Sequence, residues 1–192
     1  MILDNFTPLP KDLRGWNGDA PIFKRMVEQV RPKVIVEVGS WKGQSTVSLA
    51  KACKELGLDT KIYCVDTWLG AIEFYTHPTE ERDLMKKHGY PQVYYQFISN
   101  LYHEGVIDMV ETIPLPSNVA HVVVPQADLI YIDASHEYQD VADDIENFSK
   151  KLNDGGIMFG DDYNNSVFPG VRQAVDEANG VAVDGWYWAI YN

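Results

Sequence analysis

The chain has few cysteines and few basic residues, and both shortages narrow the classes of protein to which it can belong. Only two of its 192 residues are cysteines, Cys53 and Cys64, which is too few for a disulfide framework. We expect both to be buried, reduced thiols. Lys and Arg total 16 against 28 Asp and Glu, so the net charge is −12. This acidity disfavours nucleic acid as a partner, because such binding neutralises phosphates, and it disfavours an anionic membrane surface.

Long apolar runs, internal repeats and low-complexity stretches are also missing. No run is long enough to cross a membrane, and residues 1–10 lack the basic and then apolar stretches of a signal peptide. Apolar residues make up 45% of the sequence, which is typical of globular proteins. We therefore expect one cytoplasmic domain over residues 1–192, beginning with an irregular segment, residues 1–18, that is interrupted by proline and glycine.

The most informative stretch is a β-branched run followed by two glycines. Residues 34–38 predict a buried strand, Gly39 and Gly43 predict a turn, and apolar residues at helical spacing follow. Such a turn directs a helix N-terminus at whatever lies beyond the strand. The third glycine of the dinucleotide pattern is absent, and Glu37 would repel a pyrophosphate. An acid there suits an ammonium group, such as the methionyl end of S-adenosylmethionine. By itself the stretch is equally compatible with an ordinary buried strand and a tight turn.

A second strand, residues 61–66, ends in Asp66. In nucleotide-binding α/β folds an acid at this point accepts hydrogen bonds from ribose hydroxyls. Trp68 follows, and the pattern leaves open whether its ring packs on an adenosine or fills the core. Residues 71–90 then mix aromatic, titratable and helix-breaking residues, so we expect a lid or substrate-binding insertion there. A solvated surface insertion is the alternative.

Three carboxylates follow two later strands. One buried strand ends in Asp133, with His136 three residues later, and a further strand ends in Asp161 and Asp162. If these strands are neighbours, the acids converge at the edge where α/β sheets bind ligands. Clustered carboxylates repel one another, and a hard divalent cation such as Mg²⁺ relieves that repulsion. Each residue taken separately is also compatible with an ordinary turn or helix start.

The C-terminal third gives two predictions about the fold. Residues 153–156, Asn-Asp-Gly-Gly, predict a turn that precedes a strand over residues 157–160. After a helix over residues 168–179, two short runs joined by Asp184-Gly185 predict a β-hairpin over residues 181–191.

Taken in order, these motifs resemble those of the metal-dependent class I S-adenosylmethionine-dependent O-methyltransferases. More narrowly, they resemble the branch that contains the macrocin-type sugar O-methyltransferases and the cephalosporin hydroxylase-like proteins. The resemblance covers roughly residues 30–190. It implies an α/β, three-layer sandwich on a Rossmann-like, seven-stranded, mostly parallel sheet with a C-terminal antiparallel hairpin. The motifs that carry it are Glu37-x-Gly39, Val65-Asp66-Thr67-Trp68, Ile132-Asp133-x-x-His136-x-Tyr138, and Gly155-Gly156 leading to Asp161-Asp162.

The resemblance also implies ligands for particular residues. Metal binding, by Mg²⁺ as the expected ion, falls to Asp133, Asp161 and Asp162. Contacts with S-adenosylmethionine fall to a larger set, in which Ser117 belongs to the adenine pocket: Glu37, Gly39, Ser40, Gly43, Ser45, Asp66, Thr67, Trp68, Ser117 and Asp133.

The implied reaction moves the sulfonium methyl group to an acceptor hydroxyl, with a sugar or small polyol as the expected acceptor. His136 stands where related enzymes carry a lysine base, and an imidazole can accept a proton near neutral pH. Three alternatives remain: an NAD-dependent oxidoreductase, a methyltransferase that needs no metal, and a non-catalytic cofactor-binding or assembly protein. Homo-oligomerisation is left open by the sequence.

Overall fold

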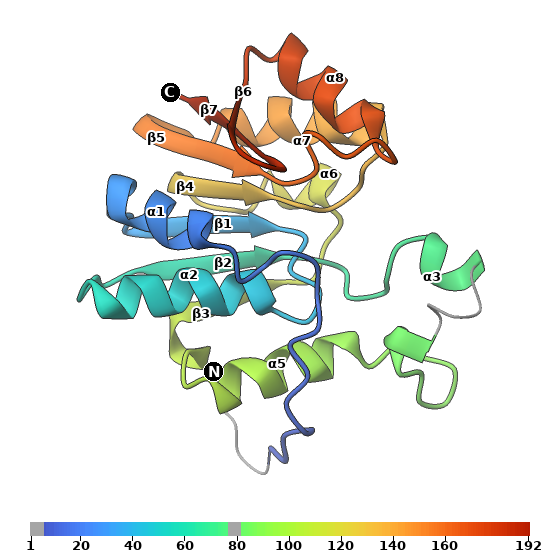
Figure 1. The fold of residues 1–192 in the computed structure, drawn as a ribbon. Coiled ribbons are helices and arrows are strands. Elements are labelled where there is room, and N and C mark those ends of the chain that lie inside the picture. The colour runs from blue at the N-terminus through green and yellow to red at the C-terminus, as the bar shows by residue number, and fades with distance from the viewer. Residues whose placement is uncertain (1–5, 77–81) are drawn as a thin grey trace.

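The computed structural model describes residues 6–76 and 82–192, whose strands form one twisted sheet between two layers of helices (Figure 1). The strand order is β3-β2-β1-β4-β5-β7-β6. Strands β1 to β5 are parallel to one another, and β7 is antiparallel to both β5 and β6. The predicted α/β class, the mostly parallel sheet and the C-terminal hairpin are confirmed. The strands are β1 (Val34–Val38), β2 (Lys61–Val65), β3 (Val110–Ile113), β4 (Ala127–Ile132), β5 (Leu152–Gly160), β6 (Val181–Asp184) and β7 (Tyr187–Tyr191).

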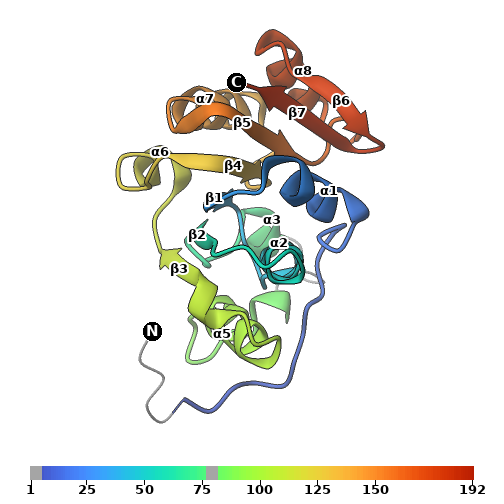
Figure 2. The ribbon, with the colours of Figure 1, turned by 90° about the vertical axis from the view of Figure 1, so that its left-hand side faces the viewer.

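Helices cover both faces of this sheet (Figure 2). Helices α1, α2 and α5 pack on one face, and α6, α7 and α8 pack on the other. None of the described helices is long and apolar enough to span a membrane. The helical elements are α1 (Pro21–Val30), α2 (Gln44–Glu55), α3 (Glu73–Thr76), α5 (Val93–His103), α6 (Ser117–Ala120), α7 (Tyr138–Ser149) and α8 (Pro169–Glu177), with 3₁₀ turns η1 (Arg82–Leu84) and η2 (Ile107–Met109).

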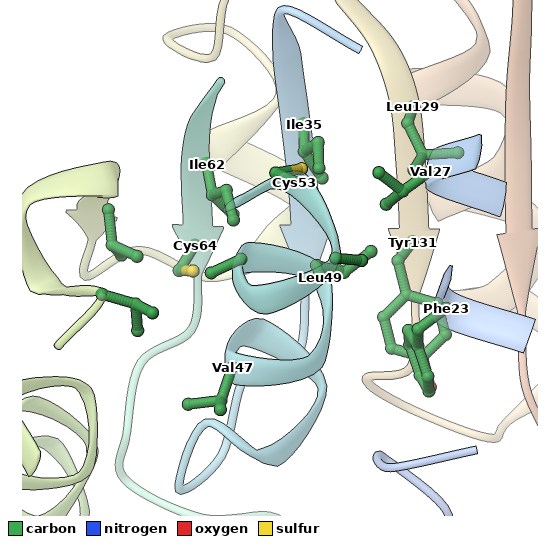
Figure 3. Packing of buried hydrophobic residues seen from close by; sticks show 14 of the residues in the cluster. Phe23, Val27, Ile35, Val47, Leu49, Cys53, Ile62, Cys64, Leu129 and Tyr131 are labelled. Carbon is green, nitrogen blue, oxygen red and sulfur yellow. The ribbon is translucent and has the colours of Figure 1, made fainter. Parts of the chain in front are cut away.

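Alternation along the central strands divides the core between the two faces. Ile35 of β1 packs with the α1 and α2 side, whereas Val36 packs with the α7 and α8 side. Figure 3 shows the first of these cores, in which Leu49 and Cys53 of α2 lie against the sheet. Burying an aliphatic side chain of this kind stabilises the fold by about 1.5–3 kcal/mol. Both cysteines are buried and unpaired, as predicted.

The described part of the irregular N-terminal segment, residues 6–18, is a strap that runs along α5 toward the start of α2 (Figure 1). Side chains of α5 satisfy its backbone: the Leu9 N–H donates to Ser99, and the Asp12 N–H donates to Asn100 Oδ1 at 2.9 Å. The Asn100 amide in turn donates to the carbonyl of Asp12 at 2.7 Å. We call residues 6–18 the N-terminal strap. Its place could not be predicted, because its contacts lie about 90 residues away along the chain.

The predicted turn at residues 153–156 is wrong, since these residues lie inside β5, which begins at Leu152. Pairing with β4 shifts register there, from Ala127 opposite Leu152 to Leu129 opposite Ile157. A bulge with Gly155 at φ +77° absorbs the extra residues. A glycine pair therefore marks a bulged strand here rather than a chain reversal.

The insertion expected at residues 71–90 is described only in part. It contains α3, η1 and a short bridge between Lys87 and Tyr90, while residues 77–81 lie outside the described residues. Its role as a lid stays a prediction.

Candidate active site at the carboxyl edge of the sheet

The turn after β1 requires glycine because it presses against the end of β4. Gly39 has φ +88°, and a Cβ on it would lie 1.9 Å from the carbonyl oxygen of Asp133. Gly43 has φ +89° and directly precedes α2, which has no side-chain cap at its N-terminus. These glycines bring the turn, the first N–H groups of α2 and the end of β4 together at one edge of the sheet.

Glu37 is fully buried, and donors from the chain itself enclose its carboxylate. Ser40 Oγ lies 2.8 Å from it, Ser45 Oγ lies 2.5 Å from it, and the hydroxyl of Thr46 and the thiol of Cys64 also donate to it. Burial raises the pKa of Glu37, and the three hydroxyl groups oppose that rise. The carboxylate therefore ties the turn and the start of α2 to β1 and has no exposed surface for a ligand.

Asp66 holds the same turn from the side of β2. Its carboxylate accepts the backbone N–H groups of Ser40 at 3.0 Å, Trp41 at 2.8 Å and Trp68 at 2.6 Å. Burial raises its pKa, and these N–H groups oppose the rise. Thr67, the next residue, accepts the N–H of Leu69. Glu37 of β1 and Asp66, directly after β2, thus both stabilise the turn after β1.

Two other residues expected to contact the cofactor have mainly internal contacts. Trp68 is 2% exposed, donates its indole N–H to the Trp41 carbonyl and packs against Phe97. The core-filling role left open by the sequence is the one that this packing supports. Ser117 begins α6, and its hydroxyl contacts the buried carboxyl of Asp144 in α7.

The ends of β4 and β5 bring Asp133, His136 and Asp162 together, with one ligand atom from each lying within 4.8 Å of the others. His136 Nε2 is 3.0 Å from Asp162 Oδ2 and 3.7 Å from Asp133 Oδ1. Tyr131 donates its hydroxyl to Asp133 at 2.9 Å, and the His136 ring stacks on Phe168 with centroids 4.1 Å apart. The Asp133 carboxylate and the His136 ring are therefore each held in place by a neighbour.

The nitrogen at the centre of this group is electrostatically unusual. His136 Nε2 is buried and makes no hydrogen bond of good geometry to any described residue, despite its two carboxylate neighbours. Burial by itself would lower the pKa of His136, but the carboxylates of Asp133 and Asp162 outweigh it and raise that pKa to about 10. The arrangement thus concentrates negative charge around a buried nitrogen.

Asp161, the remaining acid of the expected metal set, faces a different environment. It is 5% exposed; its Oδ1 accepts the Asp162 N–H at 2.7 Å, and its Oδ2 accepts the Asn17 amide at 3.3 Å. Burial and the nearby Asp133 charge raise its pKa to about 7. The structure groups His136, rather than Asp161, with Asp133 and Asp162. The spacing of His136 behind Asp133 was a usable signal for this, whereas Asn17, 144 residues from Asp161, gave none.

Two carboxylates and one imidazole at this spacing fit a divalent cation. The buried Nε2, which makes no hydrogen bond of good geometry to a described residue, and the two carboxylate oxygens beside it form a donor set for a cation that replaces the imidazole proton. Carboxylates suit Mg²⁺ or Mn²⁺, whereas the imidazole also admits Zn²⁺ or Fe²⁺.

Three comparisons relate the chain to known proteins. Residues 36–163 match a family model described as a methyltransferase domain. The uncharacterized protein y4gI of Sinorhizobium fredii is 26% identical over 146 residues, which is 75% of this chain but only 14% of that protein's length. The chain therefore corresponds to a small part of this much longer relative.

Solved structures share the fold at low identity. Cofactor-bound Rv0187 from MTB superposes with a TM-score of 0.65 at 15% identity, covering 97% of this chain and 84% of that one. The O-methyltransferase TomG from Streptomyces achromogenes, in complex with SAM, gives 0.63 at 15% identity over 96% and 83%. The Bacillus cereus O-methyltransferase, in complex with SAH, gives 0.63 at 18% over 96% and 84%. Since the matched family model spans more than half of the chain and contains both the glycine turn and the acidic group, the chain belongs to the family of methyltransferase domains.

Proposed function

We propose that this domain transfers the methyl group of S-adenosylmethionine to an acceptor hydroxyl, and that a divalent cation takes part. A sugar or small polyol is the expected acceptor. Family membership supports methyl transfer. The relatives solved with SAM or SAH, both named O-methyltransferases, support this cofactor and an oxygen acceptor. The observation that carries the proposal is the contact between Gly39 and the end of β4, which sets the glycine turn beside the group Asp133, His136 and Asp162.

On the cofactor side, the chain's contribution is a fixed turn and an uncapped helix. The start of α2 offers free N–H groups and a favourable dipole to the methionyl carboxylate. Asp66 lies directly after β2, where an acid in nucleotide-binding α/β folds accepts ribose hydroxyls, and backbone N–H groups hold its carboxylate in place. Glu37 would act indirectly, by holding Ser40 and Ser45 in position.

On the acceptor side, Asp133, His136 and Asp162 would hold the cation. When bound, it would supply Lewis-acid chemistry that lowers the pKa of a coordinated hydroxyl. Tyr131 orients Asp133, and Phe168 fixes the plane of the His136 ring. His136 Nε2 cannot both bind the cation and accept the acceptor's proton. In a metal-free reaction His136, the base that the sequence suggested, would first have to lose a proton, because its pKa is raised to about 10.

The test is transfer of labelled methyl from S-adenosylmethionine to a panel of sugars, polyols and phenols, with Mg²⁺, Mn²⁺ or EDTA present. The proposal expects transfer to at least one hydroxyl compound and its loss in EDTA. EDTA-resistant transfer would show that no cation is needed, and His136 would then be the candidate base. No transfer to any acceptor, with the cofactor bound, would favour the non-catalytic alternative.

A further inference from the structure

Lys42 lies inside the glycine turn, and its ammonium group is buried. Only 1% of its side chain is exposed. A buried cation is costly unless acids pair with it. Its partners come from two distant segments: Asp12 of the N-terminal strap, at 3.2 Å, and Asp83 of η1, at 3.7 Å. The turn, the strap and the insertion therefore meet at one lysine.

Arg14 extends this contact into an alternating network of four charges. Its guanidinium binds both oxygens of Asp12, at 2.7 and 2.8 Å, and lies 3.5 Å from Asp83. Because the Arg14 side chain is 70% exposed, water screens its ion pairs strongly. Of the two cations in this network, Lys42 is therefore the one whose ion pairs are shielded from solvent.

The same three segments each contribute one aromatic ring beside the network. Trp41 of the turn stacks on Phe74 of α3, with centroids 4.6 Å apart and planes 20° apart. Trp16 of the strap lies 6.2 Å from Trp41 and 6.3 Å from Phe74. Lys42 Nζ lies 5.5 Å from the centre of the Trp41 ring. The charges therefore hold the strap and the insertion where their rings enclose Trp41.

This junction borders both halves of the candidate site. The Trp41 N–H is bound by Asp66, on the cofactor side. Asn17, next to Trp16, donates its side-chain amide to Asp161 at the end of β5. Tyr187 holds the Asn17 carbonyl at 2.8 Å, which fixes this end of the strap. Movement of the strap would thus alter contacts at both ends of the site, beside Asp66 and beside Asp161.

We propose that Lys42 is a positioning residue that locks the strap and two described parts of the insertion, residues 73–76 and 82–90, around Trp41. What these segments enclose rests on the proposed function, but the lock itself does not. Removing the charge leaves Asp12 and Asp83 facing each other across the turn with only exposed Arg14 between them. Both segments should then separate from the turn together.

The experiment compares Lys42→Met with Lys24→Met, which removes an exposed lysine of α1 that pairs with the exposed Glu55 of α2. Hydrogen exchange measured by mass spectrometry reads the lock without any ligand. In Lys42→Met we expect exchange at least about fivefold faster in both residues 7–18 and residues 82–90. Lys24→Met should leave both unchanged. Faster exchange in neither segment, or in one alone, would overturn the proposal.

A second readout connects the lock to the site. S-adenosylhomocysteine should bind Lys42→Met about tenfold more weakly, and Lys42→Arg, which keeps the charge, should recover part of that loss. If Lys42→Arg loses as much S-adenosylhomocysteine affinity as Lys42→Met, the shape of the side chain rather than its charge holds the segments, which would contradict the proposal. If Lys42→Met does not fold, Asp83→Asn replaces it: this change removes one partner of Lys42 and should speed exchange in residues 82–90, and unchanged exchange there would overturn the proposal. Absence of S-adenosylhomocysteine binding to the unmodified protein would defeat the proposed function but leave the exchange result to decide the lock.

Discussion

At the scale of single residues, the orientation of Asp133 depends on one buried tyrosine. Tyr131 is 0% exposed and donates its hydroxyl to Asp133 Oδ2 at 2.9 Å. Groups that orient a metal ligand typically contribute 10–100-fold to metal affinity. We therefore expect Tyr131→Phe to weaken Mn²⁺ binding by about tenfold in a calorimetric titration. Tyr63→Phe, on the other face of the sheet, is the control. Equal affinities for Tyr131→Phe and the unmodified protein would show that the hydroxyl does not orient a ligand.

The two adjacent acids after β5 should behave differently. Asp162 Oδ2 faces His136, whereas both oxygens of Asp161 are hydrogen-bonded within the chain. Asp162→Asn should therefore reduce Mn²⁺ affinity by about 100-fold or more, while Asp161→Asn should cost less than about tenfold. Affinity of S-adenosylhomocysteine should change little in Asp162→Asn. The reverse order of metal affinities would restore the ligand set Asp133, Asp161 and Asp162 that the sequence suggested.

A buried acid outside the site gives a test on stability. Burial raises the pKa of Asp144 to about 6, from 3.8. The folded state therefore binds a proton more tightly than the unfolded state, so this group costs stability as pH rises from about 4 to about 6. Asp144→Asn should be more stable than the unmodified protein by about 2–3 kcal/mol at pH 7.5 and similar to it at pH 4, measured by urea unfolding. A variant that is destabilised at both values would mean that the carboxylate is needed for its contact with Ser117.

Sequence reasoning reached the acids of the site but not what surrounds them. Asp133, Asp162 and Asp66 were located because each stands at the end of a predicted strand, and the ends of parallel strands share one edge. The enclosure of Glu37 was not predictable, because its donors are hydroxyl and thiol groups, which are also common in turns and helix starts. Whether a carboxylate is buried can be known only from the three-dimensional positions of the residues around it.

At the scale of elements, helices and central strands were predictable and the N-terminal strap was not. Apolar periodicity located α8 to within two residues of the predicted range 168–179, because a core-facing stripe repeats along the chain. The strap has no helical or strand periodicity of apolar residues. Its backbone is bound instead by the side chains of Ser99 and Asn100, which lie far away in the sequence. The start of β5 was misplaced for a related reason, because a bulge carries the same glycines as a turn.

The strap lies so close to α2 that a single methyl group should displace it. A Cβ on Gly18 would lie 2.8 Å from the backbone nitrogen of Ser45, which cannot move freely. We expect Gly18→Ala to lower the free energy of unfolding by about 1–3 kcal/mol and to speed hydrogen exchange in residues 7–18. Gly15→Ala is the matched control, because its Cβ would meet only the flexible end of Gln44, at 2.9 Å. Equal effects of the two changes would contradict the tight seating of Gly18.

At the scale of the whole molecule, the sheet topology creates the site. The order β2-β1-β4-β5 brings the ends of four parallel strands to one edge, where Asp66, the glycine turn, Asp133 and Asp162 lie. The resemblance to class I methyltransferases implied a mostly parallel, seven-stranded sheet, whereas the sequence left open whether β4 and β5 are neighbours, which the structure shows. The closure of that edge by the strap and the insertion is a property of the assembled molecule, carried by Lys42 and its partners.

The most direct measurement is a calorimetric titration of the unmodified protein with S-adenosylhomocysteine, with NAD⁺ as the comparison, in EDTA and in Mn²⁺. The account predicts that S-adenosylhomocysteine binds in both buffers and NAD⁺ in neither, because the turn after β1 lacks the third glycine of the dinucleotide pattern. It also predicts Mn²⁺ binding that Asp162→Asn removes. Binding of NAD⁺ without S-adenosylhomocysteine would contradict the account and favour an oxidoreductase.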